Sequence, residues 1–208
     1  CYYQPTLELL KKILPIFSYT FHPIFIPVFA SLIYLFYNQT YFTIQEKLFV
    51  VLQIIILTVF IPVLFYFLLR SAGKIDSIMI AEISQRKIPL VLQCFLIILL
   101  VRKSITVDRY PELHFFFLSG LLSTLCALAL LFTRVKASLH MLTISALTMF
   151  VIGLSVHYQT HAIYLISFLV LMNGFVASSR LEMKAHTFKE LVIGFFIGAI
   201  PQLLLFRF

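Results

Sequence analysis

The chain has 208 residues, of which 62% are hydrophobic and 12% charged, and its formal net charge is +8. Soluble globular chains have roughly 45–50% apolar and about 25% charged residues. This apolar excess is larger than a soluble core can bury, because the remaining surface must be covered by polar side chains. Composition therefore excludes a water-soluble domain and also disordered, collagen-like and coiled-coil chains, and it predicts an integral membrane protein.

The positive charge does not indicate nucleic acid, because the Lys and Arg residues are scattered in small groups between apolar runs. Membrane lipids and the phosphate group of a lipid are the expected partners. Cys94 and Cys126 lie inside apolar runs, where thiols behave as small hydrophobic groups, so no disulfide framework is expected. Cys1 stands where a Met would begin a chain, and we expect it to follow a longer segment.

The first predicted element is an interfacial helix over Thr6–Ile16, in which Lys11 and Lys12 lie among leucines. Residues 1–17 are therefore expected at the membrane surface and residues 18–208 in a transmembrane bundle, all within one domain. Pro23 and Pro27 are expected to bend the first span.

Seven uncharged apolar runs follow, and a bilayer core needs roughly 20 helical residues to cross it. The predicted fold is therefore an all-α, polytopic membrane bundle of about seven spans. The third run is short, and a re-entrant piece stays open as an alternative. The runs are Ser18–Tyr37, Leu48–Leu69, Ile88–Val101, Phe115–Phe132, Ser138–Val156, Ala162–Ser178 and Leu191–Phe206.

Gly194 and Gly198 in the last run form a small-xxx-small pair, which predicts close approach of another helix or of a second copy of the chain. If all seven runs cross, the loops after the second, fourth and sixth lie on one side. That side holds eleven of the sixteen Lys and Arg residues. Five of the eleven are candidate phosphate ligands, however, so the orientation stays open. These five are Lys74, Arg86, Lys87, Lys136 and Arg180.

The most informative segment is 179–190, which joins the sixth run to the seventh. His186 and Glu190 are four residues apart, so on a helix start the carboxylate can hold one imidazole nitrogen and leave the other free to attack. Arg180 supplies a planar cation for phosphate oxygens. An ordinary interfacial salt bridge is the alternative reading.

A second polar segment opens the fifth run, on the same side by span count. Ser138 and His140 stand at a predicted helix N-terminus, where free N–H groups and the helix dipole favour an anion. His140 is the candidate proton donor to a leaving oxygen. The alternative is a helix-capping Ser beside a His at headgroup level.

These two segments resemble the motifs of the type 2 phosphatidic acid phosphatase superfamily. Its third motif, Ser-Arg, five residues, His, three residues, Asp, is matched from Ser179 with Glu190 in place of Asp. Its second, Pro-Ser-Gly-His, is matched at Ser138 and His140.

The first motif of the superfamily, Lys, six residues, Arg-Pro, is matched poorly around Arg86, since Met79 stands at the Lys position. The stretch from Lys136 to Gln202 is similar to small multi-span members from Bacteroidetes-type bacteria.

The resemblance implies a superfamily-like helical core and hydrolysis of a lipid phosphomonoester or diphosphate through a phosphohistidine, in a bacterial inner membrane. It makes His186 the nucleophile, Glu190 its orienting group and His140 the general acid. It implies no metal and no cofactor, in agreement with a chain whose aspartates are Asp76 and Asp108. The implied phosphate ligands are Arg180, Arg86, Ser138, Lys87 and Lys74.

The remaining histidines are expected to serve the membrane interface. His157 and His161 are read as loop residues because the sequence puts no Cys or carboxylate near them, and His22 and His114 as headgroup-level residues. Two isolated aspartates argue against Asp-rich metal-dependent lipid transferases. The departures from the superfamily motifs keep a second function open, a catalytically inactive accessory subunit of a larger membrane complex.

Overall fold

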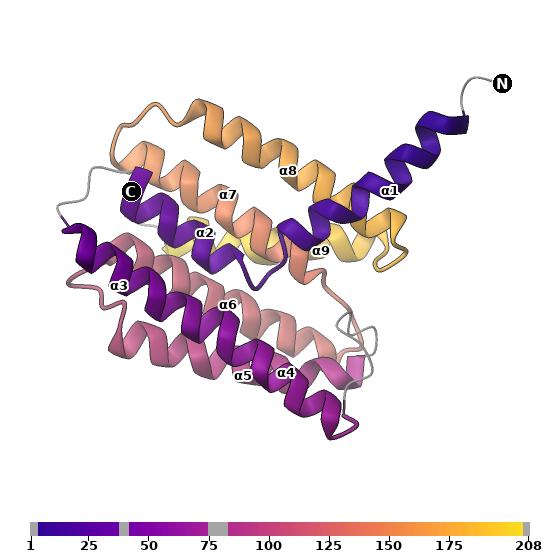
Figure 1. The fold of residues 1–208 in the computed structure, drawn as a ribbon, viewed down its shortest axis with the longest axis horizontal. Helices are drawn as coiled ribbons and strands as arrows, with labels where there is room; N and C mark the ends of the chain where they lie inside the picture. The colour runs from indigo at the N-terminus through magenta and orange to yellow at the C-terminus, as the bar shows by residue number, and fades with distance from the viewer. Residues whose placement is uncertain (1–3, 38–41, 75–82, 206–208) are drawn as a thin grey trace.

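The computed structural model describes residues 4–37, 42–74 and 83–205, and every regular element within these ranges is a helix. Figure 1 shows a bundle of roughly antiparallel helices with one helix, α1 (Gln4–Thr20), extending away from its body. The all-α prediction is confirmed for the described residues. In a medium without water, helices are favoured because they satisfy their backbone hydrogen bonds internally.

The first predicted span is not one helix. The chain leaves α1 after Thr20, turns through Pro23, and resumes as α2 (Ile26–Leu32) with a wider π-helical end, η1 (Ile33–Tyr37). Proline lacks an N–H group and restricts the residue before it, so Pro23 and Pro27 interrupt the helix where only a bend was expected. The resulting α2–η1 helix is apolar but short for a crossing.

The second run forms one long helix, Ile44–Ser71, made of α3 (Ile44–Ile55), a π-helical turn η2 (Ile56–Phe60) and α4 (Ile61–Ser71). The widened turn lies just before Pro62, which cannot donate a backbone hydrogen bond. The later runs lie in α5 (Ile83–Lys103), α6 (Pro111–Phe132), α7 (Leu139–His157), α8 (Ile163–Glu182) and α9 (Phe188–Leu205).

Within the described residues, five helices are long and apolar enough to cross a membrane: Ile44–Ser71, α6, α7, α8 and α9. The predicted seven spans are thus shown only in part. Besides α2–η1, the exception is α5, whose uncharged part from Ile88 to Val101 is shorter than a span and has a pair of basic residues at each end.

Helix α7 forms the centre of the bundle and packs against α9, α8, α6 and α2. Of its most apolar stretch, 67% is buried, against 17–39% for the other four candidate spans. Its contact with α9 is the closest, because a Cβ atom on Gly194 would lie 2.5 Å from the Ser138 carbonyl oxygen and one on Gly198 would collide with Leu142. The packing partner of this glycine pair is therefore α7 of the same chain.

Candidate functional site

The connection from α8 to α9 is a tight reversal that places His186 between two helix ends. Helix α8 ends in a Schellman motif, in which Ala185 N–H donates to the Arg180 carbonyl and Lys184 adopts φ of 50°. Helix α9 begins with a capping box. Thr187 Oγ1 accepts from Glu190 N–H at 3.4 Å, and Glu190 Oε2 accepts from Thr187 N–H at 3.0 Å.

The predicted contact between His186 and Glu190 is present, with 2.9 Å between Nδ1 and Oε2. His186 precedes α9, so the capping geometry of Glu190 makes this contact and not a shared helix face. A carboxylate only accepts hydrogen bonds, so Nδ1 carries the proton and Nε2 presents a lone pair. The His186 side chain is 2% exposed. This is the arrangement that an imidazole nucleophile needs.

Two arginines act on this imidazole. Burial lowers the pKa of His186 to about 4; the hydrogen bond to Glu190 opposes this effect, and the charges of Arg86 and Arg180 add to it. Arg180 is buried in the last turn of α8, and Arg86 is half-buried near the start of α5. Parts of the chain almost a hundred residues apart therefore bring two cations to one imidazole, as an anion-binding site requires.

Ser138 and His140 lie at the N-terminus of α7, beside the start of α9. Ser138 N–H donates to the Glu190 carbonyl at 3.1 Å, and Ser138 Oγ caps α7 by accepting from Met141 N–H at 3.5 Å. His140 is buried, and a charge on His186 is close enough to act on it. The segments that carry the second and third motifs therefore meet at one end of the bundle, called the site end below.

The two lysines predicted to bind phosphate, Lys74 and Lys87, are both exposed but have different surroundings. Lys74 is exposed in the turn after α4, with no contact to the histidines in the described part of the chain. The ammonium group of Lys87 is exposed and lies 5.0 Å from the centre of the Phe132 ring. Arg86 is thus the basic residue of this region whose charge reaches His186. Asp76 and Met79 fall outside the described residues.

Sequence reasoning missed the contribution of the first helix. Ser18 Oγ lies 2.6 Å from Ser179 Oγ, and the Ser18 carbonyl oxygen lies 3.1 Å from His140 Nε2. The His22 ring stands perpendicular to the His140 ring, with centroids 5.1 Å apart. The sequence predicts His22 as a headgroup-level residue from its own span alone, without reference to the other helices. The signal in the sequence was a Ser and a His four residues apart beside a helix-breaking Pro23.

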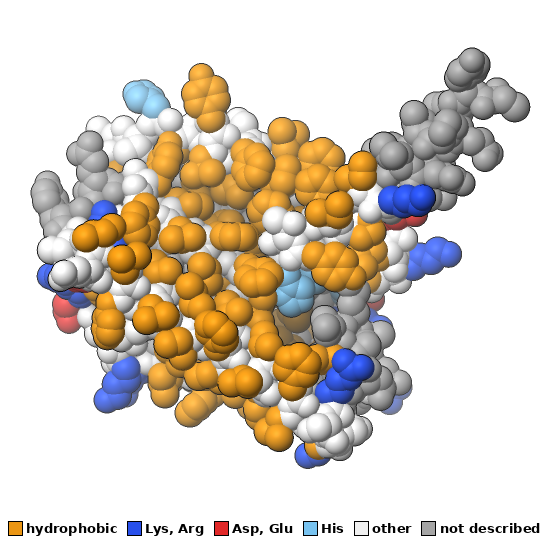
Figure 2. Space-filling view, viewed as in Figure 1, with side chains coloured by type: hydrophobic (Ala, Val, Ile, Leu, Met, Phe, Trp, Pro, Cys, Tyr) orange, Lys and Arg blue, Asp and Glu red, His pale blue; other side chains and the backbone are white. Residues whose placement is uncertain are grey.

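A cavity of about 300 Å³ opens to the surface between α2, α7 and α8. Its described lining is apolar and includes Phe21, which precedes His22 in the chain. Figure 2 shows apolar side chains over most of the face in view, with basic side chains toward its margins. Among the other lining residues are Phe29, Leu32, Leu147, Leu165 and Phe168.

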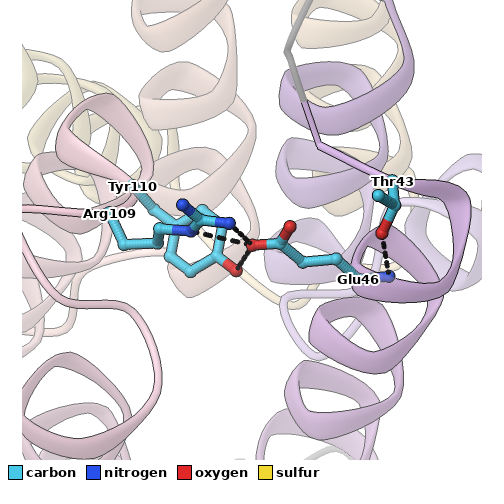
Figure 3. A network of polar contacts seen from close by, with 4 residues as sticks. All are labelled: Thr43, Glu46, Arg109 and Tyr110. Carbon is cyan, nitrogen blue, oxygen red and sulfur yellow. Dashed lines mark hydrogen bonds and ion pairs between the residues drawn. The ribbon is translucent and has the colours of Figure 1, made fainter.

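The opposite end of the bundle holds two carboxylate clusters. Glu46 Oε1 accepts from Arg109 at 2.7 Å and from Tyr110 at 2.9 Å, while Thr43 caps the same helix (Figure 3). Glu112 accepts from Tyr34 and Tyr158.

The Glu112 carboxylate also lies 3.3 Å from His157 Nε2. The expectation that His157 has no carboxylate nearby is therefore wrong. Glu112 comes from α6, 45 positions earlier in the chain, and reaches His157 because α6 begins where α7 ends.

Comparison of the chain with protein-family models, with curated proteins and with solved structures found no match. Among the described residues, no group of three or more His, Cys, Asp and Glu side chains is placed to hold a metal ion. The function must therefore be argued from the site itself.

Proposed function

We propose that the chain is a membrane lipid phosphatase that hydrolyses a phosphomonoester or diphosphate through a phosphohistidine on His186. The observation that carries the proposal is the His186–Glu190 pair, 2.9 Å apart, with a buried imidazole on which the charges of two arginines act. The sequence resemblance to the type 2 phosphatidic acid phosphatase superfamily supports the same assignment.

In the proposed reaction His186 Nε2 attacks the phosphorus atom, a nitrogen–phosphorus bond forms and the bond to the lipid oxygen breaks. Glu190 holds the proton on Nδ1 and stabilises the positive charge that develops on the ring. Arg180 and Arg86 offset the negative charge on the three equatorial oxygens. Water then attacks the phosphohistidine and releases inorganic phosphate, with no metal ion in either step.

The departing lipid oxygen must gain a proton, and His140 is the residue proposed to supply it. Its Nε2–H is donated to the Ser18 carbonyl, so Nδ1 of the neutral ring carries a lone pair. In the proposed step Nδ1 first takes up a proton from water and then passes that proton to the departing oxygen. This transfer matters most for a monoester, whose alkoxide is a poor leaving group, and less for a diphosphate.

An amphiphilic substrate is favoured over a soluble phosphate ester by the apolar cavity that begins at Phe21. The hydrocarbon chain of a membrane lipid is already out of water, so the cavity favours it by offering an apolar surface that the chain can pack against. Phe21 lines the cavity, and the next residue, His22, contacts the His140 ring. We therefore propose that one molecule places its phosphate among the histidines and its hydrocarbon chain among the phenylalanines.

We further propose that α5 and α2–η1 complete a seven-span bundle in a bacterial inner membrane. Helix α2–η1 is short, but it leads from the turn at His22, at the site end, to Tyr34, whose hydroxyl donates to Glu112 at the opposite end. Helix α5 starts near Arg86 at the site end, and the chain just beyond its other end contacts the start of α6, where the Ile105 carbonyl oxygen lies 2.6 Å from His114 Nδ1. A helix of 21 residues is roughly 31 Å long, enough for a hydrocarbon core.

The second function, an inactive accessory subunit, is favoured by one set of observations. Glu190 caps α9, Ser138 caps α7 and His140 bonds to Ser18, so each of these residues also has a structural use. On this alternative the site end is a scaffold and binds no substrate.

A phosphatase assay separates the two functions. Purified protein in detergent should release phosphate from a long-chain lipid phosphate faster than from a short soluble ester, and His186→Ala should abolish release from both. Equal background rates for the wild type and His186→Ala, on phosphatidate, a polyprenyl diphosphate and a lipid A phosphate alike, would favour the accessory subunit.

A further inference from the structure

Two buried hydrogen bonds hold the turn between α1 and α2 against the site end. The hydroxyl groups of Ser18 and Ser179 are hydrogen-bonded, and His140 Nε2 donates to the Ser18 carbonyl. Ser18 and Ser179 are at most 1% exposed. The segment that follows is therefore held over the first turn of α7 and the last turn of α8.

His22 is the titratable residue of this turn, and its orientation is defined by a backbone contact. Ile24 N–H donates to His22 Nδ1 at 3.4 Å, so Nδ1 is an acceptor and the proton of the neutral ring lies on Nε2. The ring is half-buried against His140. Burial lowers the pKa of His22, and the Arg180 charge lowers it further, so the ring is neutral near pH 7 and lies within reach of that arginine's charge.

In its neutral form, His140 has no N–H group left to donate to a bound phosphate, although the sequence suggested this role. Its Nε2–H is already donated to Ser18, and Nδ1 then carries a lone pair. Phosphate oxygens also carry lone pairs, so this ring cannot hold them until it gains a second proton. The neutral His22 ring, in contrast, has a proton on Nε2 that its Nδ1 contact leaves in place.

We propose that His22 is a third imidazole of the site and that its Nε2–H donates a hydrogen bond to an oxygen of the phosphate group that His186 attacks. This inference rests on the proposed function and extends it to a residue outside the three motif segments. It also gives the N-terminal segment a role in binding, since Phe21 meets the apolar chain and His22 the phosphate of the same molecule.

The test uses two variants that separate the two ring nitrogens. A Gln amide group places its N–H donor near the position of Nε2, whereas the shorter Asn places its polar group near Nδ1. Vanadate inhibition and kcat/KM on a long-chain lipid phosphate are measured for wild type, His22→Gln and His22→Asn in detergent. His161→Asn, an exposed loop change at the opposite end of the bundle, is the matched control.

His22→Asn should weaken vanadate inhibition and lower kcat/KM by about 10- to 100-fold, as expected for the loss of a hydrogen bond to a charged group. His22→Gln should stay within about threefold of wild type, and His161→Asn should match it. In protein labelled with ¹⁵N-histidine, the protonated Nε2 signal of His22 should shift when vanadate is added.

The inference is overturned if His22→Asn retains wild-type inhibition, or if Asn and Gln cause equal losses together with a lowered unfolding temperature. The second result would make His22 a packing residue only. A wild-type protein that neither binds vanadate nor hydrolyses any lipid phosphate would overturn the proposed function as well. Failure of the inference alone leaves the wild-type activity and its dependence on His186 intact.

Discussion

At the scale of single residues, Glu190 performs two tasks with one carboxylate. It accepts from Thr187 N–H as part of the capping box and from His186 Nδ1 as the partner of the imidazole. A capping box favours Glu or Gln at this position, because the longer side chain reaches back to the N-cap residue. This requirement gives a local reason for Glu where the superfamily motif has Asp, and it allows the two tasks to be separated.

Two substitutions separate the cap from the imidazole partner. Glu190→Gln keeps a capping side chain but removes the charge, so kcat should fall by about 10- to 100-fold while the unfolding temperature changes little. Thr187→Ala removes the hydroxyl half of the box, so the protein should lose about 0.5–2 kcal/mol of stability and keep its activity. Turnover assays and thermal unfolding followed by circular dichroism measure both. Unchanged turnover in Glu190→Gln would reduce the pair to a structural contact.

The lowered pKa of His186 predicts that the folded protein loses stability as the pH falls. Above about pH 6.5 the ring is neutral in both the folded and the unfolded chain. Below it the unfolded chain gains a proton that the folded chain resists until about pH 4, so stability falls across this window. Unfolding temperatures measured from pH 7 to pH 4 should therefore drop more steeply for wild type than for His186→Gln. Parallel curves would show that His186 does not titrate in this way.

At the scale of elements, the α7–α9 contact sets the spacing of the site. Gly194 lies against the Ser138 backbone, one turn along α9 from Glu190, so the two motif segments are held together by the absence of a side chain. The sequence predicts that another helix approaches this glycine pair closely. It does not predict which helix, because helix pairing depends on the three-dimensional arrangement of all the helices.

Adding one methyl group tests this contact. Gly194→Ala should push α7 away from α9, lower the unfolding temperature and reduce turnover, because Ser138 and Glu190 move apart. Gly174→Ala in α8 is the control: a Cβ atom there has no neighbour within 4 Å, so it should be neutral or stabilise by about 0.5–1 kcal/mol. Equal effects of the two substitutions on turnover would mean that the α7–α9 spacing does not control the site.

Other elements mark the limit of sequence reasoning. The apolar runs predicted the helices well, because apolar length determines which segments enter lipid. They did not predict the break at residues 21–25. In a run that is apolar throughout, the prolines are the only sign that the helix loses a backbone hydrogen bond. The contacts of Ser18 and His22 were equally hidden, because they depend on how α1 lies across α8.

At the scale of the whole molecule, polar groups gather at two ends separated by the length of α7. His140 and His186 lie at the site end, and Glu46 and Glu112 at the opposite end. With 19 residues, α7 is roughly 28 Å long, close to the thickness of a hydrocarbon core. A membrane around the apolar surface between them would expose the two ends to different compartments.

Cysteine labelling tests that arrangement. In a background with the natural cysteines replaced, single cysteines at Lys74, Lys136 and Lys184 should react with a membrane-impermeant maleimide from one side of sealed vesicles. A cysteine at Arg109 should react from the other side. A label reaching Lys74 or Lys184 from the side that labels Arg109 would show that the loops of the site do not share a compartment.

The central claim, hydrolysis through a covalent phosphate on His186, is tested most directly by trapping that intermediate. Purified protein is mixed with lipid phosphate carrying a radioactive phosphoryl group, with chelator present, and is quenched in alkali, in which phosphohistidine survives. Wild type should carry an acid-labile label that vanadate prevents, and His186→Gln should carry none. Label that persists in His186→Gln, or hydrolysis that stops when chelator is added, would contradict the account.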